Sequence, residues 1–348
     1  MNEDTERRRA PSAAGRRRMP RRLAPAIGLF VLAPVCAEYL AGYDDSVGRV
    51  WALLGGLLIL GPLYGGPALI IREVVRRTGR GWPSMLLLAV AFGLVQAGLV
   101  DQSLFDPAYR DIDSWAGTRN PTAIPALGIS VHTAIVFVAG HVVWSLGAPI
   151  AMVESLVPQR ATTPWLGRTG LAVTGVLYVL AALLIFADHQ NTQQFLATLA
   201  QLISTTVLVA ALIVVAFLLG RQPRPAIDRA APRPWRVGAL AVIAFGVFDL
   251  AGTDWLGVAV QVTALTALVV LVGRGSRRTG WGPDQRLALA AAPLLTRSWI
   301  AFLVPPLGDS PLHLKLAHNA FFAVGIVLLV TLGLHALHRN AGNSSGSP

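Results

Sequence analysis

The chain has 348 residues, of which 54% are hydrophobic and only 14% are charged, and its mean hydropathy is +0.57. Soluble proteins carry about 25% charged residues, so this composition excludes an ordinary soluble domain and indicates a membrane protein. The net charge of +11 lies in short segments between apolar runs rather than on one continuous face, so we predict no nucleic-acid partner.

Residues 1–22 are polar and rich in arginine, which predicts a disordered basic tail. The apolar run that follows has no A-x-A cleavage site, so we expect a retained signal anchor rather than a removed signal peptide. Lys315 is the only lysine among the 29 basic residues, a bias typical of a high-GC bacterium. Cys36 is the single cysteine and cannot form an internal disulfide, so a small core residue is expected.

Apolar runs of near-spanning length then follow one another to residue 338 and predict an all-α polytopic bundle of about ten spans. Residues 23–338 form this transmembrane domain, and a second disordered tail is expected at 339–348. The runs are 23–43, 50–71, 84–101, 128–157, 169–187, 195–220, 237–251, 256–273, 287–304 and 318–338.

The orientation follows from the basic residues between the runs. With the N-terminus in the cytoplasm, 24 of the 29 basic residues fall in cytoplasmic segments and four in outer loops. This distribution obeys the positive-inside rule at every loop, so we predict that both termini lie in the cytoplasm of a bacterium and that the chain crosses its inner membrane.

Several spans have features of their own. The segment 61–67 holds two prolines and three glycines in the middle of the second run, which predicts a kinked or interrupted helix that lines a site or allows close packing. The run 128–157 is too long for one perpendicular span, so it tilts, kinks at Pro149 or begins outside the bilayer. Residues 252–255 predict a tight helical hairpin, and the loop 102–127 is expected to lie across the outer face.

Polar side chains at membrane depth are costly and are therefore candidate functional residues. Eight of the nine that we find fall in the middle or outer half of their spans, which predicts a polar cavity that opens outward. The nine residues are Glu38, Gln96, Asp101, His132, His141, Glu154, Asp249, Arg297 and His318. Four of them are the candidate substrate-binding residues: Glu38, Gln96, His141 and Arg297.

Arg297 lies ten residues into its run and needs an anionic partner, for which Glu38 is the best-placed acid. Two interpretations stay open, namely a site for a small anion or an anionic lipid headgroup, and a buried Glu38–Arg297 pair that joins two helices.

His141 and Ser145 lie 40° apart on a helical wheel and share one face, whereas His132 lies on the opposite face. One regular helix therefore does not bring the two histidines to one metal ion, and we predict no metal site. A hydrogen bond from His141 to a neighbouring helix is the alternative to a functional role.

Three segments have the order found in the CPBP intramembrane proteases, the family of CAAX proteases and bacteriocin-processing proteins. They are Phe92-Gly93-Leu94-Val95-Gln96-Ala97-Gly98-Leu99, His141-Val142-Val143-Trp144 and His318-Asn319. The chain resembles that family over less than a quarter of its length. The resemblance implies an intramembrane protein without the metalloprotease activity, because Gln96-Ala97 stands where the family has its glutamate pair.

Three functions are compatible with this sequence. The first is a transporter or permease for a small anionic or amphiphilic substrate. The second is an intramembrane enzyme that acts on a lipid or peptide at the outer leaflet, and the third is a structural or partner-binding subunit. The sequence has no nucleotide-binding motif, so we predict no cofactor, and the expected partners are the lipid bilayer and an anionic lipid or small anion.

Overall fold

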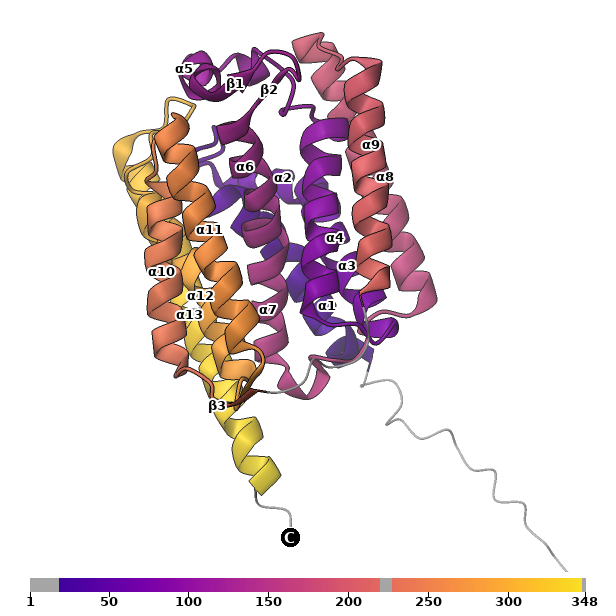
Figure 1. The fold of residues 1–348 in the computed structure, drawn as a ribbon, viewed down its shortest axis with the longest axis vertical. Coiled ribbons are helices and arrows are strands. Elements are labelled where there is room, and N and C mark those ends of the chain that lie inside the picture. Colours follow the sequence, from indigo (N-terminus) through magenta and orange to yellow (C-terminus); the bar gives the residue numbers. More distant parts are fainter. Residues whose placement is uncertain (1–18, 220–226, 346–348) are drawn as a thin grey trace, which may run out of the picture.

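The computed structural model describes residues 19–219 and 227–345, which form a bundle of helices that run roughly parallel to one another (Figure 1). Each of the ten predicted runs coincides with one helix or with consecutive helical segments. The predicted all-α bundle is thereby confirmed.

The first half of the chain is helical with short π-helical and 3₁₀ segments. Its elements are α1 (Met19–Pro34), η1 (Val35–Tyr39), α2 (Val50–Leu60), η2 (Gly61–Gly65), α3 (Gly66–Arg77), α4 (Trp82–Val95), η3 (Gln96–Val100), η4 (Tyr109–Asp111), α5 (Trp115–Arg119), η5 (Asn120–Thr122), β1 (Ala123–Ile124), β2 (Ile129–Ser130), α6 (Val131–Gly140), η6 (His141–Gly147), α7 (Ala148–Leu156) and η7 (Pro158–Arg160).

The second half has longer uninterrupted helices. Its elements are α8 (Arg168–Gln193), α9 (Leu199–Leu218), β3 (Ile227–Ala230), α10 (Pro234–Asp249), α11 (Trp255–Gly275), β4 (Arg278–Thr279), α12 (Pro283–Ile300) and α13 (Leu312–Ser345).

Seven helices in the described part of the chain are long and apolar enough to cross a membrane, so the protein is a multi-pass integral membrane protein. The remaining three runs fall short of this standard. Leu23–Tyr39 and α10 are shorter than 18 residues, and α12 carries three charged side chains, Asp284, Arg286 and Arg297. The number of about ten spans therefore stays a prediction.

Two small strand pairs lie at opposite ends of the bundle (Figure 1). β1 and β2 pair antiparallel and lie with α5 at one end, where the loop 102–127 passes over the helices. β3 and β4 pair in parallel at the other end, where α13 also leaves the bundle. We call the end with α5 the loop end and the end with β3 the terminal end.

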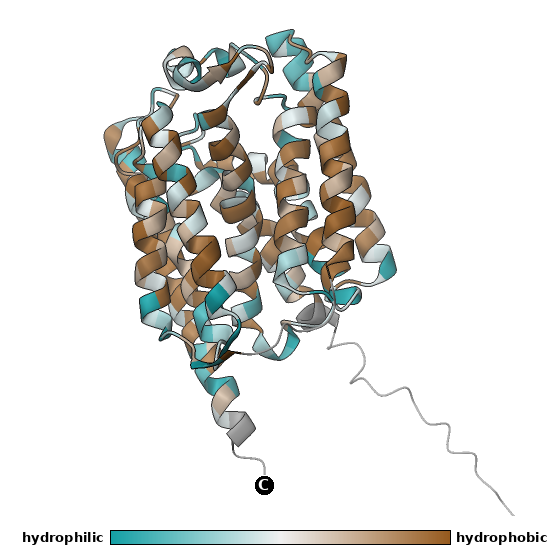
Figure 2. Cartoon of the chain, viewed as in Figure 1, coloured by the Kyte–Doolittle hydropathy of each residue, from teal (hydrophilic) through white to brown (hydrophobic). Residues whose placement is uncertain are grey.

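The core consists of two large clusters of buried apolar residues, one around α1, η2, α3 and α4 and one around α7, α10 and α12. About 61% of the most apolar window of Trp82–Val100 is buried, against 11% for α8 and 17% for α9, so the last two lie at the periphery. Apolar residues cover the middle of the bundle and polar residues its two ends (Figure 2). This distribution fits helices that cross an apolar layer with both ends in water.

The second predicted span is one continuous helical stretch, Val50–Arg77, with the π-helical segment η2 in its middle. A side chain at Gly65 would place its Cβ 2.6 Å from the Cα of Phe30, so the glycine lets η2 pack directly on the backbone of α1. Close packing, one of the two predicted roles, is thus observed. The helix also continues past the predicted end at residue 71 to Arg77.

The other predicted features have mixed outcomes. The long fourth run becomes a helix at Val131–Leu156 whose irregular segment, η6, ends just before Pro149. The hairpin at 252–255 is present, and the Asp254 carboxylate accepts a hydrogen bond of 2.8 Å from the Gly257 N–H. α13 continues into the predicted tail as far as Ser345. Of the two predicted tails, residues 1–18 and 346–348 lie outside the described residues.

Candidate functional site

Four π-helical segments lie in the first four apolar runs, and three predicted site residues belong to them. Glu38 lies in η1, Gln96 in η3 and His141 in η6, whereas η2 contributes Tyr64. π-helical turns are rare and occur frequently at functional sites. A proline ring clashes with the carbonyl of the residue four positions earlier in a regular α-helix. In two of the π-helical segments that earlier residue is Leu63, followed by Pro67, and Ser145, followed by Pro149. The wider π-helical turn relieves the clash.

A cavity of about 420 Å³ opens at the loop end between η1, η2, η3 and α8. Its floor is buried and includes Leu63, Tyr64 and Gln96, and its rim includes the exposed Asp188 and Thr192. Glu38 and Gln96 therefore share one cavity, as the prediction of an outward polar cavity requires. The volume is within the range of small-molecule sites.

Acidic residues outnumber basic ones on the wall of this cavity. The carboxylates of Glu38, Asp44, Asp101 and Asp188 line it, and Arg110 is the one arginine or lysine among the lining residues described. His189 also lines it, with Nε2 3.8 Å from Asp106 Oδ2. The cavity thus has a strong negative bias that suits a cationic ligand.

Tyrosine hydroxyls hold the Glu38 carboxylate in place. Tyr43 donates a hydrogen bond of 2.8 Å to Oε2, and Tyr64 donates one to Oε1. Both carboxylate oxygens of Glu38 are therefore held in position beside the cavity floor.

Gln96 is 1% exposed, and its Oε1 has no hydrogen-bond partner. A buried amide oxygen without a protein partner is costly, so Gln96 Oε1 is available to accept a hydrogen bond from an N–H or O–H group. Five residues on, burial raises the pKa of Asp101 to about 6, although Asp101 Oδ1 also accepts a hydrogen bond of 3.0 Å from the Ser103 N–H.

His141 lies behind the cavity floor rather than in it. Its ring stacks on Tyr64 with the centroids 5.8 Å apart and meets Phe92 edge-on at 5.4 Å. Its Nδ1 lies 3.2 Å from Ser145 Oγ, as their shared helix face predicts. His141 therefore packs against the Tyr64 ring, and the Tyr64 hydroxyl in turn positions the Glu38 carboxylate.

The expected Glu38–Arg297 pair is wrong. Arg297 forms an ion pair of 3.0 Å with Asp249 of α10, and its guanidinium lies 4.1 Å from the centre of the Trp144 ring. The cause is helix packing, since α12 lies against α10 and the Glu38 carboxylate is held by Tyr43 and Tyr64. Arg297 is thus neutralised away from the cavity, which removes the free cation on which the predicted anion site depends.

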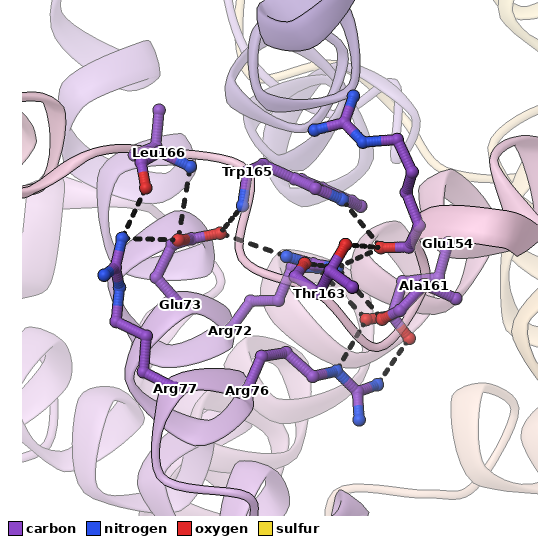
Figure 3. Close-up of polar contacts among 10 residues, drawn as sticks. Arg72, Glu73, Arg76, Arg77, Glu154, Ala161, Thr163, Trp165 and Leu166 are labelled. Carbon is purple, nitrogen blue, oxygen red and sulfur yellow. Dashed lines mark hydrogen bonds and ion pairs between the residues drawn. The ribbon is translucent and has the colours of Figure 1, made fainter.

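A second charged cluster, at the terminal end, was missed by sequence reasoning (Figure 3). Arg72 and Glu73 are 0% exposed, and Arg72 contacts both Glu73 and Glu154 at 3.0 and 3.1 Å. Arg76 also pairs with Glu154, and Arg77 with Glu73. We call these five residues the Arg72 cluster.

The Arg72 cluster joins α3 and α7 to the segment 158–166. Arg72 donates to the carbonyls of Arg160, Ala161 and Thr163, and its guanidinium lies 3.2 Å from the centre of the Trp165 ring. Glu73 accepts from the N–H groups of Trp165 and Leu166. Hydropathy assigns Arg72 and Glu73 to a loop. The one sequence signal that could have revealed the cluster is the pattern of acidic and basic residues, which continues the helix.

The loop 102–127 covers the loop end, as predicted, and reaches the cavity through Tyr109 and Arg110. Arg110 forms an ion pair of 3.0 Å with Asp44, which follows α1. Among the described residues, no group of three or more His, Cys, Asp or Glu side chains is placed to hold a metal ion.

Comparison with known proteins agrees with a membrane protein. A family model described as an uncharacterized membrane protein family matches residues 28–343. Neither the curated proteins nor the solved structures contain a match to this chain, and the resemblance to CPBP proteases is not shown by these comparisons. Since the match covers nearly the whole chain, this protein belongs to that family of multi-pass membrane proteins.

Proposed function

We propose that this protein is a permease that takes up a small, positively charged solute into the cavity at its loop end. The loop end then faces the outside of a bacterial cytoplasmic membrane, and both termini lie in the cytoplasm. The distribution of arginine supports this orientation, since 24 of the 29 basic residues fall in the segments that the sequence assigns to the cytoplasm.

The observation that carries the proposal is the composition of the cavity wall. Four carboxylate side chains and one arginine surround about 420 Å³, and the unpaired Oε1 of Gln96 lies at the floor. Carboxylate and amide oxygens are acceptors, so a ligand that donates N–H groups and carries positive charge satisfies them best.

This changes the substrate expected from the sequence. An anion was expected because Arg297 is deep in a span, but Asp249 neutralises Arg297. A small anion in the cavity would instead meet Glu38, Asp44 and Asp101. A transporter for a cationic substrate, rather than for an anionic one, therefore fits the charges of the cavity wall.

Packing on the side of the cavity toward the terminal end is compatible with an outward-facing permease. The rings of Tyr64, His141 and Phe92 pack together behind the cavity floor. Farther along the same helical stretch, the Arg72 cluster joins α3 to α7 and to the segment that follows α7. A cavity that is open on one side and packed on the other is what an outward-facing permease requires.

An enzyme at the outer leaflet is the alternative from the sequence. It requires His141 to face the substrate, whereas the Tyr64 ring lies between His141 and the Glu38 carboxylate. The first outer loop does supply the acid pair Asp44-Asp45, but Asp44 is paired with Arg110. The positions of these groups support binding better than proton transfer.

The test uses the full chain in proteoliposomes with three probes of similar shape: n-butylguanidinium, neutral n-butylurea and anionic butyrate. We expect uptake of the guanidinium probe only, driven by a negative internal potential. Glu38→Gln is expected to weaken binding about tenfold, the usual effect of removing a charge-assisted hydrogen bond.

Asp113→Asn is the matched control, because Asp113 is an exposed acid of the loop 102–127 that does not line the cavity. Uptake of butyrate in preference to butylguanidinium, or equal binding by the wild type and Glu38→Gln, contradicts the proposal.

A further inference from the structure

Arg110 lies at the mouth of the cavity and joins its two sides. Its Nη2 atom is 3.0 Å from Asp44 Oδ1 and 3.7 Å from Asp45 Oδ1, in the segment after η1. Its backbone N–H donates a hydrogen bond of 2.9 Å to Gln193 Oε1 at the end of α8. One residue of the loop 102–127 thus connects α8 to the loop that follows η1 across the opening.

The backbone at this point is unusual. Arg110 and Asp111 both have left-handed φ angles, of 57° and 49°. Non-glycine residues rarely adopt this conformation, and it persists where surrounding contacts hold it. The neighbouring Tyr109 supplies such contacts, because its ring packs against Trp115 and His189.

The Arg110–Asp44 ion pair is easily opened. The two side chains are 38% and 28% exposed, and ion pairs with this degree of exposure contribute little net stability. In contrast, Gln96 at the floor is fully enclosed and lacks a partner for Oε1. A cation that enters can therefore replace Arg110 at Asp44 at little cost and reach acceptors that Arg110 leaves unsatisfied.

We infer that Arg110 is a tethered cation that closes the mouth of the cavity, and that the solute is an organic cation whose guanidinium or ammonium group displaces the Arg110 guanidinium from Asp44. This inference rests on the proposed function, because it presumes that the cavity is the binding site. It adds the chemical class of the solute and the residue with which the solute competes.

The first experiment compares variants of Arg110 in binding n-butylguanidinium. Arg110→Gln keeps a polar side chain and removes the competing charge, so we expect about tenfold tighter binding than wild type. Arg110→Lys keeps a tethered cation, so it is expected to bind the probe more weakly than Arg110→Gln does. Arg119→Gln removes an arginine from the same loop but away from the cavity, and is expected to leave binding unchanged.

Equal or weaker binding by Arg110→Gln overturns the inference. The same binding measurement with n-butylammonium in place of n-butylguanidinium shows which of the two cationic groups the cavity prefers. Competition by Na⁺ or Mg²⁺ at the same concentrations contradicts an organic cation.

The second experiment measures access to the cavity directly. Leu60 is a half-buried lining residue, so Leu60→Cys reports on the interior, and Cys36 is 1% exposed and gives a low background in the parent chain. Labelling rates are measured with cationic, neutral and anionic methanethiosulfonate reagents. Addition of Arg110→Gln is expected to raise the rate severalfold even for the neutral reagent, because the mouth opens.

The two proposals fail in different ways. If the cationic reagent does not label Leu60→Cys faster than the anionic one, the acidic binding cavity of the proposed function is wrong. If the cation preference is present but Arg110→Gln leaves the neutral rate unchanged, only the role of Arg110 as a closure is wrong.

Discussion

The guanidinium of Arg72 lies 3.2 Å from the centre of the Trp165 ring and is fully buried at the terminal end of the bundle. This contact fastens the segment between α7 and α8 to α3. Eight and ten residues earlier on the same helical stretch, Tyr64 and Pro62 belong to the π-helical segment at the cavity floor. One continuous helix therefore connects the candidate binding site with the Arg72 cluster.

Arg72→Met is expected to destabilise the protein by roughly 3–5 kcal/mol, because it leaves Glu73 and Glu154 buried with fewer partners. The free energy of unfolding in mixed detergent micelles measures the effect. Arg168→Met, at an exposed arginine that begins α8, is the control and is expected to change stability little. Similar losses in both variants contradict a structural role for the Arg72 cluster.

A double-mutant cycle tests the partner of Arg297. Asp249→Asn and Arg297→Gln are each expected to cost about 3 kcal/mol, and the double variant less than the sum of the two. The coupling free energy is expected to be roughly 0.5–3 kcal/mol. The same cycle with Glu38→Gln in place of Asp249→Asn should give a coupling free energy near zero. Strong coupling of Arg297 to Glu38 and none to Asp249 contradicts the pairing with Asp249.

Gly65→Ala is expected to destabilise the protein by about 1–3 kcal/mol, because the new methyl group overlaps the Phe30 backbone. Thermal unfolding in detergent measures the change. Gly55→Ala on the same helical stretch has nothing within 4 Å of its new methyl group, and we expect it to be neutral or stabilising. A neutral Gly65→Ala variant contradicts the close approach of α1 and η2.

Binding of n-butylguanidinium is expected to strengthen as the pH rises from 5 to 7. Burial raises the pKa of Asp101 to about 6, so its carboxyl is mostly neutral below that pH and mostly negative above it. The added charge stands beside Glu38 in the cavity and attracts a cation, so we expect about tenfold tighter binding at pH 7 than at pH 5. Titration calorimetry at both pH values measures this difference.

Asp101→Asn is the control for the pH profile. The variant cannot ionise at this position, so its affinity is expected to stay near the pH 5 value of the wild type. An unchanged pH profile in Asp101→Asn assigns the titration to another group of the cavity.

The helical class and the sequential apolar runs could be read from the sequence. Position along a helix is proportional to residue number, at about 1.5 Å per residue, so the sequence predicts Glu38 and Gln96 in the middle or outer half of their spans. In the structure the two residues line one cavity. The identity of the Arg297 partner could not be obtained in this way, since Glu38 and Asp249 are predicted in the same half of the membrane.

Only the tertiary structure decided which helices are neighbours. Packing of α10 on α12 selects Asp249 for Arg297, and it leaves the cavity acidic, with Arg110 from a distant loop as its counter-charge. Packing of α3 on α7 and the segment 158–166 likewise turns Arg72 and Glu73 from apparent loop residues into buried ones. Hydropathy reports how each segment partitions into an apolar layer, whereas the sign and place of a binding site depend on lateral contacts between segments far apart in the sequence.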